Sequence, residues 1–154
     1  MNLSDYLNKN RVSYEFIDKK STIHTADAAA ATGISLERIT KALVCLGDDN
    51  QAYIAIIPGD RHLRIKEVAK AFNLKKARLC PFDEAHKYSG YAPGATPPVC
   101  YKNIKGIVID AKILEFEEIY GGGGSNEKLV KLRTNDVVRL NNAYVSDISF
   151  VAKH

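Results

Sequence analysis

Cysteine is scarce in this chain of 154 residues, and its arrangement argues against two kinds of small protein. The three cysteines, Cys45, Cys80 and Cys100, are an odd number and form no C-x-x-C pair. A disulfide scaffold needs paired cysteines, and a zinc ribbon needs closely spaced pairs. Cys45 lies in an apolar run, so we expect it in the core. Cys100 has no histidine placed by the sequence to activate it as a nucleophile.

Long apolar runs and targeting segments are also missing. No stretch approaches the ~18 consecutive apolar residues of a membrane-spanning helix. Residues 1–7 lack the basic start and apolar run of a secretory signal. The sequence therefore predicts a cytoplasmic protein in a reducing compartment, with no membrane partner.

Several catalytic motifs are absent as well. The chain has no serine nucleophile elbow, no P-loop and no G-x-G-x-x-G between a strand and a helix. Its four histidines show no metal-ligand spacing with one another or with carboxylates. We therefore predict no metal and no cofactor. An enzyme of this composition would use backbone donors, a lysine and water, or a group on the substrate itself.

Neither sign of charge dominates. Twenty-two Lys and Arg against 18 Asp and Glu give a net charge of +4, whereas proteins that coat duplexes carry a denser basic stripe. This charge fits contact with the end of a nucleic acid, and equally no such contact. The densest basic stretch, residues 61–78, is either a solvated face or a guide for a phosphate backbone. The apolar content of 45% is enough for one core, so we expect a single domain over residues 1–154.

Local patterns predict an α+β fold. Thr25, the alanines after it and Gly33 predict a helix with Thr25 as its N-cap. The apolar runs at residues 42–46 and 52–57, separated by Gly-Asp-Asp-Asn, predict a hairpin. Further strands are expected at residues 12–17, 77–80, 106–110, 117–120, 129–132 and 143–148, and further helices at 4–10, 36–40, 65–73, 82–88 and 134–140. A strict β-α-β alternation is missing, which indicates a mixed, curved sheet with helices around it.

Residues 90–98, Gly-Tyr-Ala-Pro-Gly-Ala-Thr-Pro-Pro, are the most unusual segment. Nine residues hold two glycines, three prolines and no charge. Proline lacks the amide N–H and fixes φ, so the segment can neither continue a helix nor lie inside a sheet. A stiff, uncharged loop of this kind suits the wall of a small polar pocket. A simple connector between two elements is the alternative.

Three further features could contribute to such a pocket. The four glycines at residues 121–124 exceed what a hairpin turn needs, which suggests close backbone approach to a ligand or a nest of amides for an anion, against the alternative of a flexible hairpin tip. Lys41, at the start of an apolar strand, points either into a pocket or out to solvent. His24 directly precedes the expected N-cap, where it contacts a ligand or lies on the surface.

The order and spacing of six segments carry a family resemblance. The segments are HTADAAAATG (residues 24–33), ITKALV (39–44), IIPGDR (56–61), GYAPGATP (90–97), VID (108–110) and IYGGGG (119–124). Together they resemble the YbaK/EbsC family of the prolyl-tRNA editing domain superfamily, over nearly the whole chain.

The resemblance implies a stand-alone trans-editing deacylase that hydrolyses mischarged aminoacyl-tRNA, typically Cys- or Ala-tRNA(Pro). It implies a barrel-like mixed sheet, contact with the 3′ end of the tRNA, and prolyl-tRNA synthetase as a possible partner. Catalytic roles are implied for Lys41, Gly90 and Gly94. Substrate-binding roles are implied for His24, Thr25, Tyr91, Ala95, Thr96, Pro97, Gly121, Gly122, Gly123 and Gly124.

The chain also departs from the family pattern. Where relatives often read Gly-Gly-(Ile/Val)-Ser-Pro, this chain has Gly-Ala-Thr-Pro-Pro at residues 94–98, so Ala95 should stiffen the loop. A tyrosine near Lys19 and an aspartate near Leu129, found in some members, are absent. We expect the substrate preference to be determined in the loop. A non-catalytic module that docks on a synthetase or on charged tRNA is the alternative, and a cell-wall role is disfavoured because no export signal is present.

Overall fold

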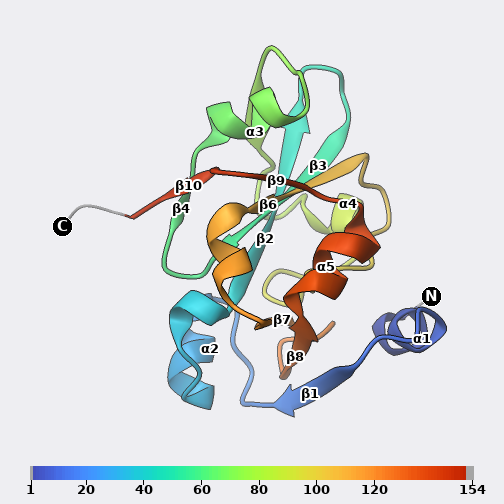
Figure 1. Ribbon diagram of the computed structural model, residues 1–154, viewed down its shortest axis with the longest axis vertical. Coiled ribbons are helices and arrows are strands. Elements are labelled where there is room, and N and C mark those ends of the chain that lie inside the picture. The colour runs from blue at the N-terminus through green and yellow to red at the C-terminus, as the bar shows by residue number, and fades with distance from the viewer. Residues whose placement is uncertain (1, 152–154) are drawn as a thin grey trace.

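The computed structural model describes residues 2–151, and a five-stranded sheet lies at its centre (Figure 1). The sheet runs in the order β5 (Ala77–Leu79), β2 (Thr40–Gly47), β3 (Ala52–Pro58), β6 (Gly106–Asp110) and β9 (Tyr144–Ser146). β2 and β3 form the predicted antiparallel hairpin. β6 and β9 add in parallel, so the sheet is mixed, as expected.

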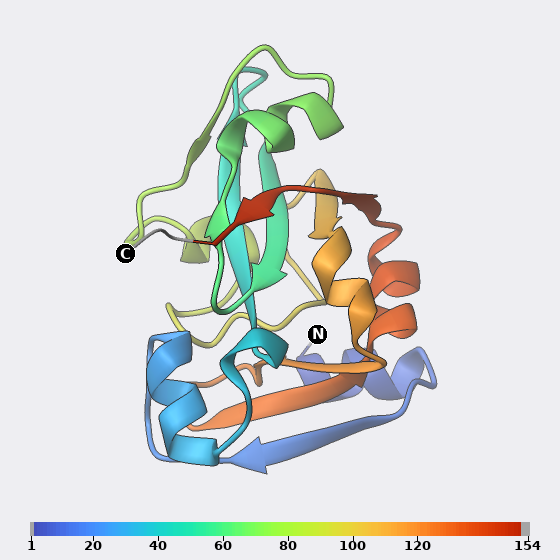
Figure 2. The ribbon, with the colours of Figure 1, turned by 60° about the vertical axis from the view of Figure 1, so that its left-hand side comes forward.

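Two smaller sheets complete the strands. One is antiparallel, in the order β1 (Tyr14–Asp18), β8 (Lys128–Arg133) and β7 (Glu118–Gly122), and the other pairs β4 (His62–Leu63) with β10 (Ser149–Phe150). Figure 2 shows β1 and β8 lying across the lower end of the central sheet. The α+β fold is confirmed, but the strands divide among three sheets and do not close into a barrel. The edge strands of the central sheet are short, and among residues 2–151 one isolated β-bridge, from Ile39 to Tyr120, joins the two larger sheets.

The helices are short and surround the sheets. They are α1 (Leu3–Lys9), α2 (Thr25–Thr32), α3 (Ile65–Ala71), α4 (His86–Ser89) and α5 (Thr134–Asn141), with 3₁₀ helices η1 (Leu36–Arg38) and η2 (Ala111–Glu115). α2 ends at Gly33 in the left-handed conformation, as predicted. The expected cap at Thr25 is wrong by one residue, because His24 holds the extended N-cap position and no side chain caps the helix. The helix expected at residues 82–88 is confined to α4, and turns precede it.

Burial follows the position of each strand in the sheet. β3 lies between two neighbours with both faces covered, so all seven of its residues are buried. Ile54 and Ile56 pack into the core beneath α1 and α5, whereas Ala55 and Ile57 pack toward α3. Cys45 on β2 is fully buried on the α3 side, and burial raises the pKa of its thiol to about 12. The expectation of a core cysteine is therefore confirmed.

Candidate functional site

A cavity of about 470 Å³ opens where β5 leaves β2. In the described part of the chain β5 pairs with β2 only at residues 45–47, so the first half of β2 keeps one edge free of a partner strand. The cavity wall is formed by Ile39 and the first half of β2, the segment leading into α2, the connection after β5 and the loop expected to line a pocket. Its floor is apolar and buried, with Ile39, Ala28 and Leu129 almost without exposure.

Lys41 lies in this wall and is half-buried. Its Nζ donates a hydrogen bond of 2.7 Å to the backbone carbonyl of Arg61. Burial lowers the pKa of the Lys41 amine, while the charge of Asp60 acts in the opposite direction. An ammonium group has three donors, and contacts within residues 2–151 use one of them, which leaves two for a ligand.

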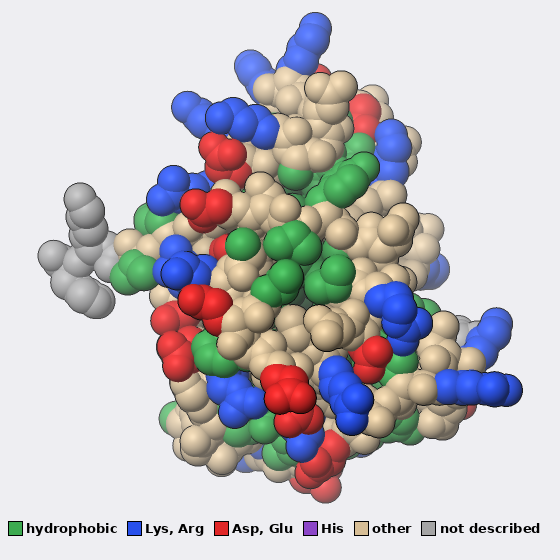
Figure 3. Space-filling view, in the orientation of Figure 1, with side chains coloured by type: hydrophobic (Ala, Val, Ile, Leu, Met, Phe, Trp, Pro, Cys, Tyr) green, Lys and Arg blue, Asp and Glu red, His purple; other side chains and the backbone are tan. Residues whose placement is uncertain are grey.

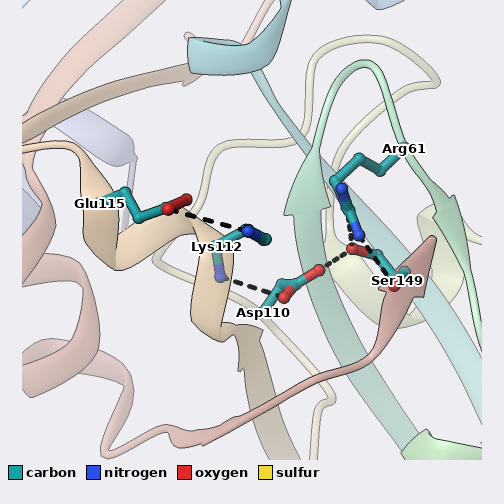
Figure 4. Close-up of polar contacts among 5 residues, drawn as sticks. All are labelled: Arg61, Asp110, Lys112, Glu115 and Ser149. Atoms are coloured by element: carbon teal, nitrogen blue, oxygen red, sulfur yellow. Dashed lines mark hydrogen bonds and ion pairs between the residues drawn. The ribbon is translucent and has the colours of Figure 1, made fainter. Parts of the chain in front are cut away.

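A buried network holds the carbonyl that Lys41 contacts (Figure 4). Arg61 donates from Nε to Ser149 Oγ at 2.7 Å and from its guanidinium to the Ser149 carbonyl at 3.1 Å. Ser149 Oγ donates to Asp110, whose other carboxylate oxygen accepts the Lys112 amide at 3.1 Å. Asp110 and Ser149 are both fully buried. Two of the six segments that carry the family resemblance, at residues 56–61 and 108–110, are thus linked through Ser149 next to the carbonyl that Lys41 contacts.

The loop at residues 90–98 forms one side of the cavity. Gly90 and Gly94 both adopt φ values in the left-handed region, +90° and +83°. At Gly94 space is also short, because a Cβ there would lie 2.7 Å from the backbone of Ile23. Two residues outside the loop hold it by hydrogen bonds to the carbonyls of its last prolines. Tyr101 donates to the Pro97 carbonyl and Asn141 to the Pro98 carbonyl, each at 2.7 Å. The loop is therefore a fixed wall.

Two backbone amides of this loop are candidates to donate hydrogen bonds to a ligand in the cavity. In the described chain the amide of Ala95 donates to Ala92 and that of Tyr91 to Ser89. No hydrogen bond within residues 2–151 uses the amides of Gly94 and Thr96, and both residues line the cavity.

The glycine run is not the amide nest that its sequence suggests. Gly121 and Gly122 belong to β7 and pair with β8, and the amides of Gly123 and Gly124 donate to the carbonyls of Lys128 and Ala95. A Cβ on Gly122 would lie 2.5 Å from the Ala95 carbonyl carbon. The glycines therefore let β7 pack closely against the loop, so the close approach is to protein backbone. Gly122 alone of the four lines the cavity.

The structure brings together about half of the expected site residues. The cavity is lined by His24, Thr25, Lys41, Tyr91, Gly94, Thr96 and Gly122. Outside its lining are Gly90, Ala95, Pro97, Gly121, Gly123 and Gly124. Gly90, Gly123 and Gly124 instead line a second cavity of about 780 Å³ beside α1, and Tyr91 borders both cavities.

Sequence reasoning missed several lining residues. Lys19 lies in the wall, where its amine donates to Thr22 Oγ1 at 2.6 Å and to the Asn126 carbonyl, and burial lowers its pKa. Leu79 and Phe82 border the mouth. Nothing in the local sequence marks these positions, because the wall is assembled from segments distant in the chain.

Two kinds of feature are absent from the described part of the chain. Among residues 2–151, no group of three His, Cys, Asp or Glu side chains is arranged to hold a metal ion. Within the same residues, none of the helices has the length and apolar character needed to cross a bilayer.

The chain matches known proteins in sequence and in fold. Residues 20–140 match the aminoacyl-tRNA editing domain family. A protein of Enterococcus faecalis named as a candidate Cys-tRNA(Pro)/Cys-tRNA(Cys) deacylase, EbsC, is 25% identical over 136 residues, which cover 88% of this chain and 83% of that protein. The crystal structure of the hypothetical protein APE2540 has a TM-score of 0.89 and 29% identity, covering 96% of this chain and 99% of the other. The structure of a candidate trans-editing enzyme for prolyl tRNA synthetase shares the fold, with a TM-score of 0.78, 24% identity, and coverage of 89% and 87%.

Proposed function

Because this chain belongs to the aminoacyl-tRNA editing domain family, we propose that it is a stand-alone deacylase of mischarged tRNA(Pro) acting in the cytoplasm. Cysteine and alanine are the proposed amino acids, since both are smaller than proline. The similarity to EbsC supports cysteine in particular.

One observation carries the proposal: a single cavity is lined by Lys41, by the loop residues Gly94 and Thr96, and by Gly122. These residues come from three distant parts of the sequence. The volume of about 470 Å³ falls within the range of roughly 300–1,000 Å³ that holds ligands of the size of an aminoacylated nucleoside.

In the proposed complex, Lys41 acts as a fixed cation. The Arg61 carbonyl holds its amine at the wall, and the two remaining donors contact oxygen atoms of the terminal ribose or phosphate. His24 and Thr25, at the start of α2, border the same space. The partly buried environment strengthens such contacts relative to water.

Backbone groups orient the aminoacyl part in this proposal. The amides of Gly94 and Thr96 donate to the ester carbonyl oxygen as negative charge develops on it, and one such donor typically contributes ~10²–10³ in rate. Along β2, the Val44 carbonyl accepts from Cys80, so by strand alternation the amide and carbonyl of Ala42 face the same free edge. The Ala42 carbonyl can accept from the α-ammonium group of the substrate.

Water is the proposed nucleophile. It adds to the ester carbonyl carbon, the bond from that carbon to the ribose oxygen breaks, and the ribose oxygen gains the proton lost by water. The products are the free amino acid and a tRNA with a free 3′-terminal ribose. Cys80 borders the cavity, but burial raises the pKa of its thiol and so disfavours the thiolate needed for attack.

Rejection of proline is proposed to depend on the fixed loop. A pocket that binds a smaller side chain only slightly better discriminates ~10–200-fold per methylene, whereas a stiff wall excludes the proline ring by overlap. Thr96 lines the cavity, while Ala95 is buried behind it against Gly122. Ala95 thus acts through the position of the wall.

A deacylation assay tests the proposal. Purified protein is incubated with Cys-, Ala-, Ser- and Pro-tRNA(Pro), and release of the amino acid is followed. We expect release of cysteine or alanine and retention of proline. Lys41→Ala should lower the rate by about 10²-fold or more. Lys70→Ala, at an exposed lysine on α3 outside the cavity, is the matched control and should keep the wild-type rate.

Two outcomes would count against the proposal. Wild-type turnover by Lys41→Ala would remove Lys41 from the site. No release from any charged tRNA, together with measurable binding, would instead favour a non-catalytic module that docks on charged tRNA or on a synthetase.

A further inference from the structure

The apolar residues that line the cavity range from fully buried to largely exposed. Ile39 at the floor is 1% exposed, whereas three large apolar side chains at the mouth are open to solvent: Phe82 is 61% exposed, Leu79 53% and Ile23 48%. Leu79 ends β5, Phe82 follows it, and Ile23 precedes α2, so the three come from two distant segments. Three exposed apolar side chains thus line the cavity that holds the proposed reaction site.

Phe82 has no aromatic partner at this mouth. The stacked ring pairs of residues 2–151 involve other residues, and Phe82 is in none of them. Exposed apolar side chains that gather at one opening mark a binding surface, unlike those scattered singly. Because Phe82 is largely exposed, a flat ligand can reach its ring.

The charges of the cavity indicate what kind of flat ligand fits. Lys19, Lys41 and His24 line it, and no carboxylate belongs to the lining. A ligand with an aromatic ring and an anionic group satisfies both properties. A nucleotide has this chemistry, with the base for the apolar mouth and phosphate for the cations.

We propose that Phe82 stacks on the terminal adenine of the charged tRNA, between the apolar side chains of Leu79 and Ile23. The inference rests on the proposed function. The aminoacyl ester then lies inward beside Lys41 and Thr96, and the base remains at the mouth. Stacking does not select the amino acid, so Phe82 provides affinity for the common 3′ end and the loop at residues 90–98 provides selectivity.

Steady-state kinetics form the first test. Phe82→Ala should raise KM for the cognate mischarged tRNA roughly ten- to a hundredfold with little change in kcat, because base stacking is lost while the reacting groups remain. Phe82→Tyr should restore KM. Tyr144→Ala is the matched control, since Tyr144 is an aromatic residue 59% exposed that lies on β9 outside the cavity. It should leave KM unchanged.

Binding without turnover forms the second test. A tRNA(Pro) acceptor-stem RNA carries 2-aminopurine in place of the terminal adenine and an alanyl group in a non-hydrolysable amide linkage. We expect its fluorescence to be quenched by the wild type and by Phe82→Tyr, and not by Phe82→Ala.

The two tests separate the failure of this inference from that of the proposed function. Quenching that depends on Phe82 without any deacylation supports the adenine site and contradicts the enzyme. Deacylation with a KM and a quenching signal unaffected by Phe82→Ala overturns the adenine site alone. No quenching by the wild type also overturns it.

Discussion

Asp110 is a carboxyl group with no exposure, held between Ser149 and the amide of Lys112. Burial raises its pKa above the ordinary value of 3.8, with a smaller contribution from Asp147. The Lys112 amide and the charge of Arg61 oppose this shift. The folded protein therefore keeps this proton to higher pH than the unfolded chain does.

The pH dependence of stability should reveal this carboxyl group. A group whose folded pKa is raised contributes fully below its unfolded pKa, and its contribution declines as pH rises through the folded pKa. The free energy of unfolding of the wild type, minus that of Asp110→Asn, should therefore fall as pH rises from about 3.8, and level off above the folded pKa. Urea titrations at a series of pH values measure it. A difference independent of pH would contradict the assignment.

Single residues were predicted unevenly from the sequence. Lys41 could be singled out because a lysine beginning an apolar strand is a local anomaly. The burial of Cys45 followed from its apolar neighbours. The N-cap of α2 was placed one residue too late, because the preference for Thr at an N-cap does not fix the backbone conformation that decides where a helix begins. Phe82 has no local signal, since only the tertiary arrangement places it at the cavity mouth.

At the scale of elements, the position of the loop at residues 90–98 depends on hydrogen bonds from residues outside it. Asn141 on α5 donates to the carbonyl of Pro98, and both Pro97 and Pro98 are buried. A buried carbonyl that loses its donor costs about 1–3 kcal/mol. The position of the wall, and with it the size of the pocket, is thus linked to a helix outside the cavity.

Asn141→Leu should lower the free energy of unfolding by about 1–3 kcal/mol and loosen the wall. We expect the ratio of alanine release to proline release from tRNA(Pro) to fall, since the proline ring meets a less rigid barrier. Tyr101→Phe removes the hydrogen bond to the Pro97 carbonyl, so it should also lower the ratio of alanine release to proline release. Unchanged selectivity in both variants, despite lowered stability, would show that the loop does not govern proline rejection.

Elements whose signal is local were predicted well. The hairpin of β2 and β3 follows from two apolar runs and a polar turn, and β6 from an apolar run. The glycine run was expected as a loop, but its first half lies in β7 because pairing with β8 decides the conformation. The strand expected at residues 143–148 is shorter in the structure, where β9 covers residues 144–146. β10, at residues 149–150, lies beyond the expected range and joins a different sheet.

At the scale of the whole molecule, charge is dispersed. In Figure 3 Lys and Arg side chains alternate with Asp and Glu over the visible face, without a single basic stripe. The basic residues of the segment at 61–78 line neither cavity, and Arg61 instead joins the buried network. Lys19 and Lys41 are the lysines that line the proposed reaction cavity.

Salt should therefore weaken tRNA binding only modestly. Each phosphate contact with a single strand contributes a slope of about −0.7 to the dependence of log K on log salt, so two lysines predict about −1.4. Equilibrium binding of the non-hydrolysable acceptor-stem RNA between 50 and 200 mM salt, roughly the range over which such slopes are read, measures it. A much steeper slope would show that the basic segment also binds the RNA.

The network behind Lys41 also bears on the order in which the protein folds. Ser149 is 39 residues from Asp110 and 88 from Arg61 in sequence, so these hydrogen bonds close some of the longest loops in the chain. Contacts of high sequence separation form after local ones, because their loop-closure entropy is larger. The hairpin of β2 and β3 can therefore exist before the Arg61 carbonyl is fixed. A nascent chain would acquire its sheet first and the hydrogen bond that holds the Lys41 amine last. The proposed deacylase activity should therefore not appear until the β10 segment has been synthesised and has docked.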